Sequence, residues 1–588
     1  MNRPAPRPNR YKRQAESHWD HYTLSSLTEY ITREAELVSP GQVTSQISEA
    51  VNQTLSKCVT MFGLRQVRLL QECSRAQQRV MIQRLRSVMA TSADIDVAND
   101  DVINGEISTK EYRSFEEIPG PKGLPFIGSL LDYTSLGPYK LERMHLAVID
   151  RFRQYGPIFK ETIGDNTYIN IIDAEDVEHL FRNAGKTPAR PPIAPLKHYR
   201  EMKKNNIGIA SLQGEDWAKV RKPVQQVVMK PQSVQAYIPA LEKVSDDFIE
   251  LMKTNRRENG EIDNYQNELY KWALEGVCTL ALNTRLGCVD TNTDGNSDAQ
   301  QMIDATLRFF STLRDLTFSF PLYKFGIYTK TWKTFADCHD TFLKIAEKYI
   351  NKTLEELDLK EKEGKLEEEA DQPSLLSYLL SKKSLTFDEL LMIPVDLMQA
   401  GIDTTSHTIV FNLYLLATNP EVQEKVYQEV SRTLTDGEPI TVQTLQRLPY
   451  LKACIKETHR MMPTIDGTTR IPDKDIVLSG YHIPANSVIR THCIAGCMEE
   501  YFPDQHIYKP ERWLRKDCKI NPHLLLPFGS GSRMCIGRRF AEQEIQILLA
   551  KLIKAFRIEW HHQPMTQLFQ LLNAPDVPAQ FTFIDRRQ

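Results

Sequence analysis

Apolar residues recur at every third or fourth position over most of the chain after about residue 140, a spacing that predicts helices. The clearest stripe begins just after Thr386-Phe-Asp-Glu389, a capping-box pattern that opens a helix. Its members are Leu391, Val395, Met398, Ile402, Thr405, Ile409, Leu413 and Leu416. Pro394 falls inside this stripe and predicts a break or kink in the helix.

One interval favours strands instead. Between Ile476 and Cys493 short apolar runs are broken by Ser479-Gly480 and Pro484-Ala-Asn486, which predicts short hairpins. The fold class expected is therefore mainly α with small β-sheets. Three prolines within residues 118–129 predict a stiff connector, and the folded body is expected to begin there.

Composition excludes several classes of protein. A net charge of −3 argues against nucleic acid as the main partner. The 10 cysteines are scattered without a Cys-x-x-Cys pair, which argues against a disulfide framework and a tetrahedral zinc site. No run approaches the roughly 18 apolar residues of a membrane-spanning helix.

The N-terminal segment differs in charge from the rest of the chain. Residues 1–93 carry 13 Lys and Arg against 7 Asp and Glu, and apolar residues alternate with arginines over residues 57–93. This pattern is typical of a mitochondrial transit segment, and a basic arm that binds a membrane surface or a partner is the alternative. We expect an extension at 1–93, a polar linker at 94–117 and a folded domain at 118–588. Residues 17–56 have no assigned role.

A glycine-rich segment near the C-terminus carries the strongest chemical pattern, Leu526-Pro-Phe-Gly-Ser-Gly-Ser-Arg-Met-Cys-Ile-Gly537. Its glycines allow a tight turn and the close approach of a flat ligand. Arg533 supplies positive charge, and an apolar helix follows Cys535. A helix N-terminus and backbone N–H groups stabilise a thiolate. Such a site suits haem iron with one anionic axial ligand.

This segment resembles the ligand loop of the cytochrome P450 family of haem-thiolate monooxygenases, and further motifs follow in the family's order over about residues 118–588. The resemblance implies the cytochrome P450 fold and a haem-thiolate catalytic domain. It assigns Cys535 as the axial ligand of the haem iron. The other residues expected to bind the haem are Trp217, Arg221, Arg470, Phe528 and Arg533.

A second motif is structural in this family. Glu457-Thr-His-Arg460 matches its Glu-x-x-Arg, and Arg512 would complete a buried, charge-balanced cluster. His459 stands where the family usually has leucine.

The apolar stripe contains Ala400-Gly-Ile-Asp-Thr-Thr405. Gly401 costs a helix about 1 kcal/mol relative to alanine, and small residues here leave room for a diatomic ligand. The resemblance assigns Thr404 to hydrogen-bond dioxygen and Asp403 to relay protons. Without the cysteine loop, a helix bend with satisfied hydroxyls would be the favoured explanation of these residues.

The chain lacks a phosphate-binding loop, a convincing dinucleotide fingerprint and a flavin-sized domain, so electrons must come from another protein. The basic residues Lys452, Lys456, Arg538 and Arg539 resemble those with which the mitochondrial branch of the family docks an acidic [2Fe–2S] ferredoxin. That ferredoxin is reduced by an NADPH-dependent ferredoxin reductase. Ordinary solvated basic residues are the alternative. The branch implies the matrix face of the inner mitochondrial membrane.

Aromatic residues gather between Phe309 and Tyr328, beside Lys324, Lys330 and Lys333. They predict either peripheral membrane contact or the cover of a substrate cavity. The expected function is insertion of one oxygen atom from O2 into a lipophilic substrate. The alternative is a haem-thiolate isomerase, or a non-catalytic haem binder or sensor, which Asp403 and Thr404 disfavour. The sequence does not name a substrate.

Overall fold

The structure is a computed structural model that describes residues 112–586, except 125–126, 135, 165, 291–297, 320, 363–374, 382–384, 436 and 515–519. The chain divides into two compact units, Met1–Lys110 and Glu111–Gln588. The predicted N-terminal extension, and the predicted linker as far as residue 111, lie outside the described residues.

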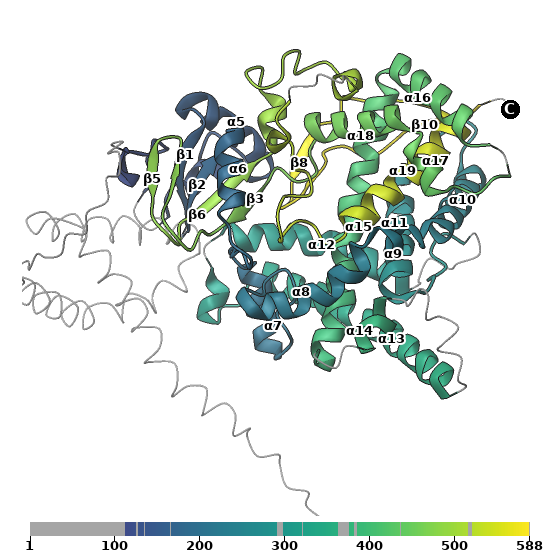
Figure 1. Ribbon diagram of the computed structural model, residues 1–588, viewed down its shortest axis with the longest axis horizontal. Helices are drawn as coiled ribbons and strands as arrows, with labels where there is room; N and C mark the ends of the chain where they lie inside the picture. Colours follow the sequence, from purple (N-terminus) through teal and green to yellow (C-terminus); the bar gives the residue numbers. More distant parts are fainter. Residues whose placement is uncertain are drawn as a thin grey trace, which may run out of the picture. The chain divides into compact units, whose positions relative to one another are not determined.

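Helices form most of the folded unit, as predicted (Figure 1). Two of them, α5 (Met144–Tyr155) and α6 (Ala174–Arg182), lie beside the largest sheet. The others are α7 (Ala194–Lys203), α8 (Gly214–Val228), α9 (Pro231–Gln235), α10 (Ile238–Asn255), α11 (Tyr265–Leu282), α12 (Asp298–Thr317), α13 (Lys330–Lys362), α14 (Leu375–Ser381), α15 (Phe387–Ala417), α16 (Pro420–Thr433), α17 (Val442–Gln446), α18 (Pro449–Met461) and α19 (Arg538–Ala555).

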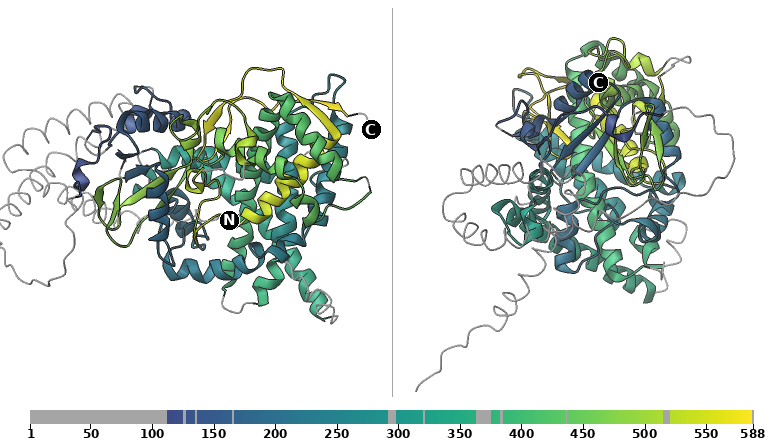
Figure 2. Two further views of the ribbon diagram at one scale, coloured as in Figure 1. Left: turned by 45° about the horizontal axis from the view of Figure 1, so that its top comes forward. Right: turned by 90° about the vertical axis from the view of Figure 1, so that its left-hand side faces the viewer.

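The largest sheet has four strands in the order β1 (Ile158–Ile163), β2 (Asn166–Ile171), β6 (Val488–His492) and β3 (Gly467–Arg470). Strand β6 runs parallel to β2 and antiparallel to β3. It thereby joins segments far apart in sequence, which Figure 2 shows in blue and light green. Three two-stranded sheets pair β4 (Ile476–Leu478) with β5 (Tyr481–Ile483), β7 (Phe556–Glu559) with β10 (Thr582–Asp585), and β8 (Gln567–Phe569) with β9 (Asn573–Pro575).

The predicted hairpin interval is confirmed, and its tightest turn uses Ser479 (φ 49°) and Gly480 (φ 78°). The prediction of only one strand-rich interval is wrong, because β1 and β2 form a second hairpin. Strand β1 directs Glu161 inward, where it accepts hydrogen bonds from the hydroxyls of Ser129 (2.5 Å) and Tyr133 (2.9 Å). This buried carboxylate interrupts the apolar pattern of the strand.

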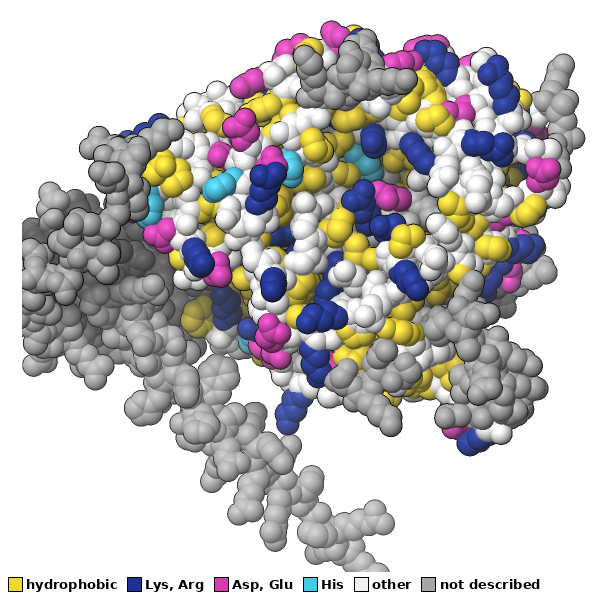
Figure 3. Space-filling model, in the orientation of Figure 1, with side chains coloured by type: hydrophobic (Ala, Val, Ile, Leu, Met, Phe, Trp, Pro, Cys, Tyr) yellow, Lys and Arg dark blue, Asp and Glu magenta, His cyan; other side chains and the backbone are white. Residues whose placement is uncertain are grey.

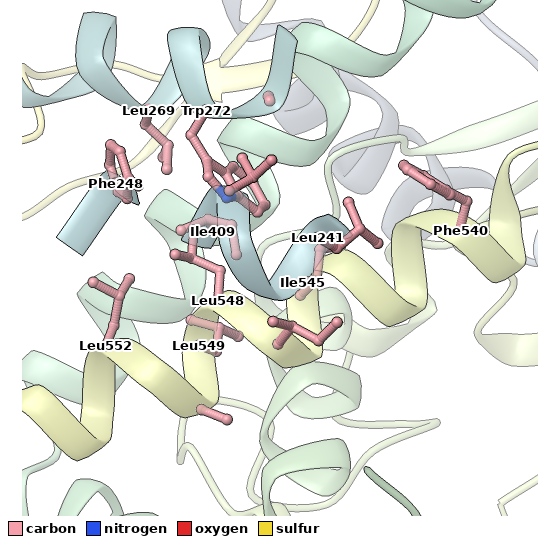
Figure 4. Packing of buried hydrophobic residues seen from close by; sticks show 14 of the residues in the cluster. Leu241, Phe248, Leu269, Trp272, Ile409, Phe540, Ile545, Leu548, Leu549 and Leu552 are labelled. Carbon is pink, nitrogen blue, oxygen red and sulfur yellow. The ribbon is translucent and has the colours of Figure 1, made fainter. Parts of the chain in front are cut away.

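The hydrophobic core is built around α15, which packs against α11 and α19. The predicted capping box is confirmed, since the Thr386 hydroxyl and Glu389 carboxylate accept each other's backbone N–H. Of the predicted break or kink at Pro394, the break does not occur: α15 runs through this residue, which is buried. In Figure 4, Ile409 of α15 meets Trp272 of α11 and Leu548 of α19.

The proline-rich connector lies along β1, an edge strand of the largest sheet. The Lys160 N–H donates to the Pro119 carbonyl (2.7 Å). A Cβ at Gly120 would lie 1.8 Å from the Lys160 carbonyl oxygen, so only glycine permits this approach. Residues before this segment also pack into the fold, since the Arg113 N–H donates to the Gly480 carbonyl (3.0 Å) beside β5.

The surface carries both signs of charge. Figure 3 shows Lys and Arg side chains interspersed with Asp and Glu over the visible face. Among the described residues, no helix is both long and apolar enough to cross a membrane.

Candidate active site

The cysteine loop lies between Phe528 and α19. The Cys535 N–H donates to the Phe528 carbonyl (2.8 Å), and Gly529 (φ 67°) and Gly531 (φ 74°) adopt conformations that favour glycine. A Cβ built at Gly531 or Gly537 would meet nothing within 4 Å. The loop therefore leaves space for a ligand close to its backbone.

Cys535 is the only exposed cysteine among those that the structure describes. Although the residue is exposed, the crowding of protein around its thiol removes water and raises the pKa. The N–H groups of Gly537 and Arg538 and the charge of Arg221 act in the opposite direction and lower the pKa. The expected stabilisation of the thiolate by backbone N–H groups is present, but burial outweighs it and the net pKa shift is upward.

Four arginines converge near this loop from separate parts of the chain. Arg190 precedes α7, Arg221 lies on α8, Arg470 ends β3 and Arg533 belongs to the loop. Burial lowers the pKa of Arg533 to about 9, and the charges of Arg190, Arg470 and Arg221 contribute. Burial likewise lowers the pKa values of Arg470 and Arg221 to about 10, with a further contribution from Arg190.

Within the described part of the chain, no carboxylate forms an ion pair with any of these arginines, although other buried arginines are paired. The Nε atom of Arg470 and the Nη1 atom of Arg533 are buried without a hydrogen-bond partner. The guanidinium of Arg533 lies 4.2 Å from the Trp217 ring centroid. Buried cations without counter-charges are unfavourable unless an anion joins them.

These residues fit a haem group. Cys535 would hold the iron, and the arginines with Trp217 would hold the propionates, which supply the missing negative charge. The sequence reasoning assigned Trp217, Arg221, Arg470 and Arg533 to this role but missed Arg190. The only sequence signal for Arg190 is a single arginine within Ala189-Arg-Pro191, outside the motifs described above.

Replacing Arg190 with glutamine is expected to speed the loss of haem from the holoprotein by roughly ten- to a hundredfold, because a hydrogen bond to a charged group contributes about 1.5–3 kcal/mol. Transfer of haem to apomyoglobin measures this rate. Lys186→Gln, which removes a charge from the same connecting segment outside the cluster, is the control. Equal rates for Arg190→Gln and the wild-type protein would contradict the assignment.

Phe528 links the loop to α18. Its ring packs edge-on against His459, with ring centroids 5.9 Å apart at 75°. His459 is buried, and burial lowers its pKa to about 4, so the imidazole is neutral at pH 7. The histidine that departs from the family pattern thus packs as an apolar ring would.

Glu457 lies fully buried at the end of α18. Its carboxylate accepts hydrogen bonds from Arg460 Nε (3.0 Å) and Nη2 (2.9 Å), and from Arg512 Nε (2.9 Å). The Trp513 indole N–H (2.8 Å) and the Lys509 backbone N–H (3.0 Å) complete the set. The structure therefore brings the three charged residues of the expected cluster together, away from the arginines near Cys535.

Asp403 is buried on α15, and its Oδ1 atom has no hydrogen-bond partner. Burial raises the pKa of this carboxyl to about 7, so it can hold or release a proton near neutrality. The half-buried Thr404 donates its hydroxyl to the Ala400 carbonyl (2.8 Å). Gly401 has a packing reason, since a Cβ there would lie 2.9 Å from Val277 Cγ2 of α11.

Helix α15, which carries Asp403 and Thr404, is joined to α19 through Thr405. Thr405 donates its hydroxyl to Glu544 Oε1 of α19 (2.9 Å). Burial raises the pKa of Glu544 to about 8, so this carboxyl is mostly protonated at pH 7. The sequence reasoning missed Glu544, whose only signal was an acid within an apolar helix.

The predicted docking residues lie on α18 and the first turn of α19. Arg538 pairs with Glu542 (3.0 Å), and the charge of the same carboxylate reaches Lys452. Lys456 and Arg539 are exposed, whereas burial lowers the pKa of the half-buried Lys452. Glu542 thus lies near both Arg538 and Lys452, and Glu429 also acts on Lys452.

The aromatic residues between Phe309 and Tyr328 fall into a buried group and an exposed group. Phe309 stacks on Phe335 and Tyr323 stacks on Trp332 within the core. Ile327 and Tyr328 are exposed by 53% and 41%. Phe320 lies outside the described residues.

A family model described as Cytochrome P450 matches residues 118–583. "Probable cytochrome P450 301a1, mitochondrial" of Drosophila melanogaster is 33% identical over 494 residues, which cover 81% of this chain and 88% of that protein. "1,25-dihydroxyvitamin D(3) 24-hydroxylase, mitochondrial" of Rattus norvegicus is 32% identical (76% and 85% covered). "Cholesterol side-chain cleavage enzyme, mitochondrial" of Bos taurus is also 32% identical (81% and 91% covered). With the cysteine loop and its arginines, these matches show that the chain belongs to the cytochrome P450 family of haem-thiolate monooxygenases.

Proposed function

We propose that this protein inserts one oxygen atom from O2 into a lipophilic substrate with electrons that a ferredoxin delivers. The observation that carries the chemistry is the exposed Cys535 beside four arginines that lack counter-charges. The matched relatives with mitochondrial names support the choice of electron donor.

The residues divide the work of catalysis. Bound haem supplies the activation of O2 and the oxidising power. The Cys535 thiolate would hold the haem iron, while the arginine cluster and Trp217 would hold the propionates. Asp403 holds a proton on its buried carboxyl, and the neighbouring Thr404 hydroxyl offers a hydrogen bond on the more accessible side of α15.

The surface of Lys452, Lys456, Arg538 and Arg539 is the proposed ferredoxin-docking surface. Charge complementarity with an acidic partner steers encounter and orientation. The expected location is the matrix face of the inner mitochondrial membrane, with an N-terminal transit segment. Exposed Ile327 and Tyr328, beside the exposed Lys330, would provide peripheral contact with that membrane.

Reconstitution tests the proposal directly. The holoprotein is mixed with a [2Fe–2S] ferredoxin, its reductase and NADPH, and with cholesterol or 1,25-dihydroxyvitamin D(3) as probe lipids. These probes come from the names of two relatives. NADPH- and ferredoxin-dependent O2 uptake supports the proposal. Conversion that needs no NADPH would favour the alternative, a haem-thiolate isomerase.

Replacing Asp403 with asparagine is expected to slow ferredoxin-dependent O2 uptake by about a hundredfold, because a positioned proton-transfer group contributes about 10²–10⁴-fold. In the wild-type protein the protonated fraction of Asp403 falls as pH rises through about 7, so the rate falls there too. The variant should lose this pH dependence. Asp337→Asn, which changes an exposed carboxylate on α13, is the control. An unchanged rate and pH profile in Asp403→Asn would contradict the proposed role.

A further inference from the structure

Helix α11 brings a hydrogen-bonded pair to α15 one turn beyond Asp403. The Tyr270 hydroxyl of α11 lies 2.9 Å from His407 Nε2 of α15. Gln266 Nε2, one turn earlier on α11, donates to the same hydroxyl (2.8 Å). Tyr270 and His407 are buried and Gln266 is half-buried. These three residues have no place in the mechanism described so far.

The hydrogen bonds favour one tautomer of His407. Gln266 donates to the Tyr270 oxygen and occupies one of its acceptor sites, which favours donation of the Tyr270 hydroxyl proton to His407 Nε2. In that arrangement Nε2 is the unprotonated acceptor. Burial lowers the pKa of His407 to about 3, so the ring is neutral and carries its one proton on Nδ1.

The Nδ1–H group of His407 lacks a hydrogen-bond partner. One helical turn earlier, the Oδ1 atom of Asp403, which is an acceptor, also lacks one. Both His407 Nδ1 and Asp403 Oδ1 are buried and unpartnered. Residues four positions apart on a helix are neighbours on its surface. The charge of Asp403 acts on Tyr270, the residue that holds His407, so the three side chains share one environment.

We propose that His407 is a positioning residue for Asp403: its Nδ1–H, favoured by Tyr270 and Gln266, donates a hydrogen bond to the Asp403 carboxylate once that group has released its proton. In the structure the two atoms are not hydrogen-bonded to each other, and the proposal requires their side chains to rotate toward one another. The inference rests on the proposed role of Asp403.

The proposed hydrogen bond would stabilise the Asp403 carboxylate, whose negative charge is not otherwise compensated. Burial alone raises the pKa of Asp403, and no cation offsets it. A neutral donor that favours the ionised form lowers the cost of releasing a proton without locking the carboxylate into an ion pair. Asp403 then remains able to take up the next proton.

The other groups that face Asp403 and His407 come from α11, α19 and β9. They are either neutral or lie at the edge of the pair. Tyr270 faces the pair from α11, and its pKa is raised well above 10. Glu544 of α19 bonds Thr405 and is mostly protonated at pH 7. From β9 the backbone of Asn573 approaches the His407 ring and favours its charged form. Asn573 is thus the rival acceptor for the Nδ1 proton.

Infrared pH titration of the Asp403 carboxyl stretch in the ferrous carbon monoxide holoprotein tests the proposal, with the band assigned by its loss in Asp403→Asn. His407→Leu should raise the titration midpoint by about one to two pH units, the range that one hydrogen bond to an ionised group supports. His407→Gln retains an N–H donor and should stay close to the wild-type midpoint. Tyr270→Phe, which keeps the ring but frees the tautomer, should give a smaller upward shift.

An unchanged midpoint in both His407→Leu and Tyr270→Phe would overturn the proposal and leave Asn573 as the partner of His407. Equal shifts in His407→Leu and His407→Gln would also overturn it, since packing rather than donation would then be responsible. Tyr270→Phe keeps the test decisive if His407→Leu fails to fold. Failure of the proposed catalytic role is distinguishable, because normal O2 uptake by Asp403→Asn would show it whatever the infrared midpoint.

Discussion

Replacing Cys535 with alanine is expected to abolish the strongly red-shifted carbon monoxide difference band of the reduced holoprotein, together with NADPH-dependent O2 uptake. The shift requires a thiolate on the iron, and Cys535 is the only exposed cysteine among the described residues. The other described cysteines are buried or half-buried, which denies a haem group access to their thiols.

Two control variants show whether the loss of the carbon monoxide band is specific to Cys535. Cys338→Ala removes a thiol from α13, far from the cysteine loop in sequence, and should retain the band at wild-type intensity. The Arg190→Gln variant should also retain the band while it loses haem faster. A wild-type holoprotein that binds haem without the red shift would show that Cys535 is not the working ligand. The monooxygenase mechanism would then fail for this chain.

The helical part of the fold was predictable because its signal is local. The stripe on α15 matches burial at nearly every position, and the capping box locates its first turn. The hairpin of β1 and β2 escaped prediction because β1 buries Glu161, and Arg151 lies 3.0 Å from that carboxylate. A buried ion pair between a strand and α5 leaves a polar residue where the pattern would need an apolar one.

The site was predictable only where one short segment contains it. The loop around Cys535 and the Asp403-Thr404 pair are contiguous motifs, so a resemblance to a known family can assign roles to them. Arg190 joins the arginines beside the loop because the chain before α7 pairs with the residue that follows β3, Ala189 with Ile471. Glu544 and His407 matter because of how α19 and α11 cross α15. The way in which helices cross depends on the packing of the whole core. The spacing of residues within one segment of the sequence does not reveal it.

Replacing Glu457 with glutamine is expected to destabilise the folded protein by about 3–5 kcal/mol, the range found when one partner of a buried ion pair is removed. Glutamine keeps the size of the side chain but removes the charge that compensates Arg460 and Arg512. Arg460 is fully buried, so its charge cannot regain water. Urea unfolding of the holoprotein, followed by circular dichroism, measures the change in the free energy of unfolding.

An exposed pair on the same structural element provides the control. Glu511 belongs to the short 3-10 helix Pro510–Trp513, as Arg512 does, and pairs with Lys425 (2.7 Å) while 38% and 56% of the two side chains remain exposed. Glu511→Gln should therefore cost about 0–1 kcal/mol, because water screens the pair. If Glu457→Gln were no more destabilising than Glu511→Gln, the buried cluster would not hold this region together. Adding Arg512→Gln to Glu457→Gln should recover part of the loss, since it removes one of the two cations left without a counter-charge.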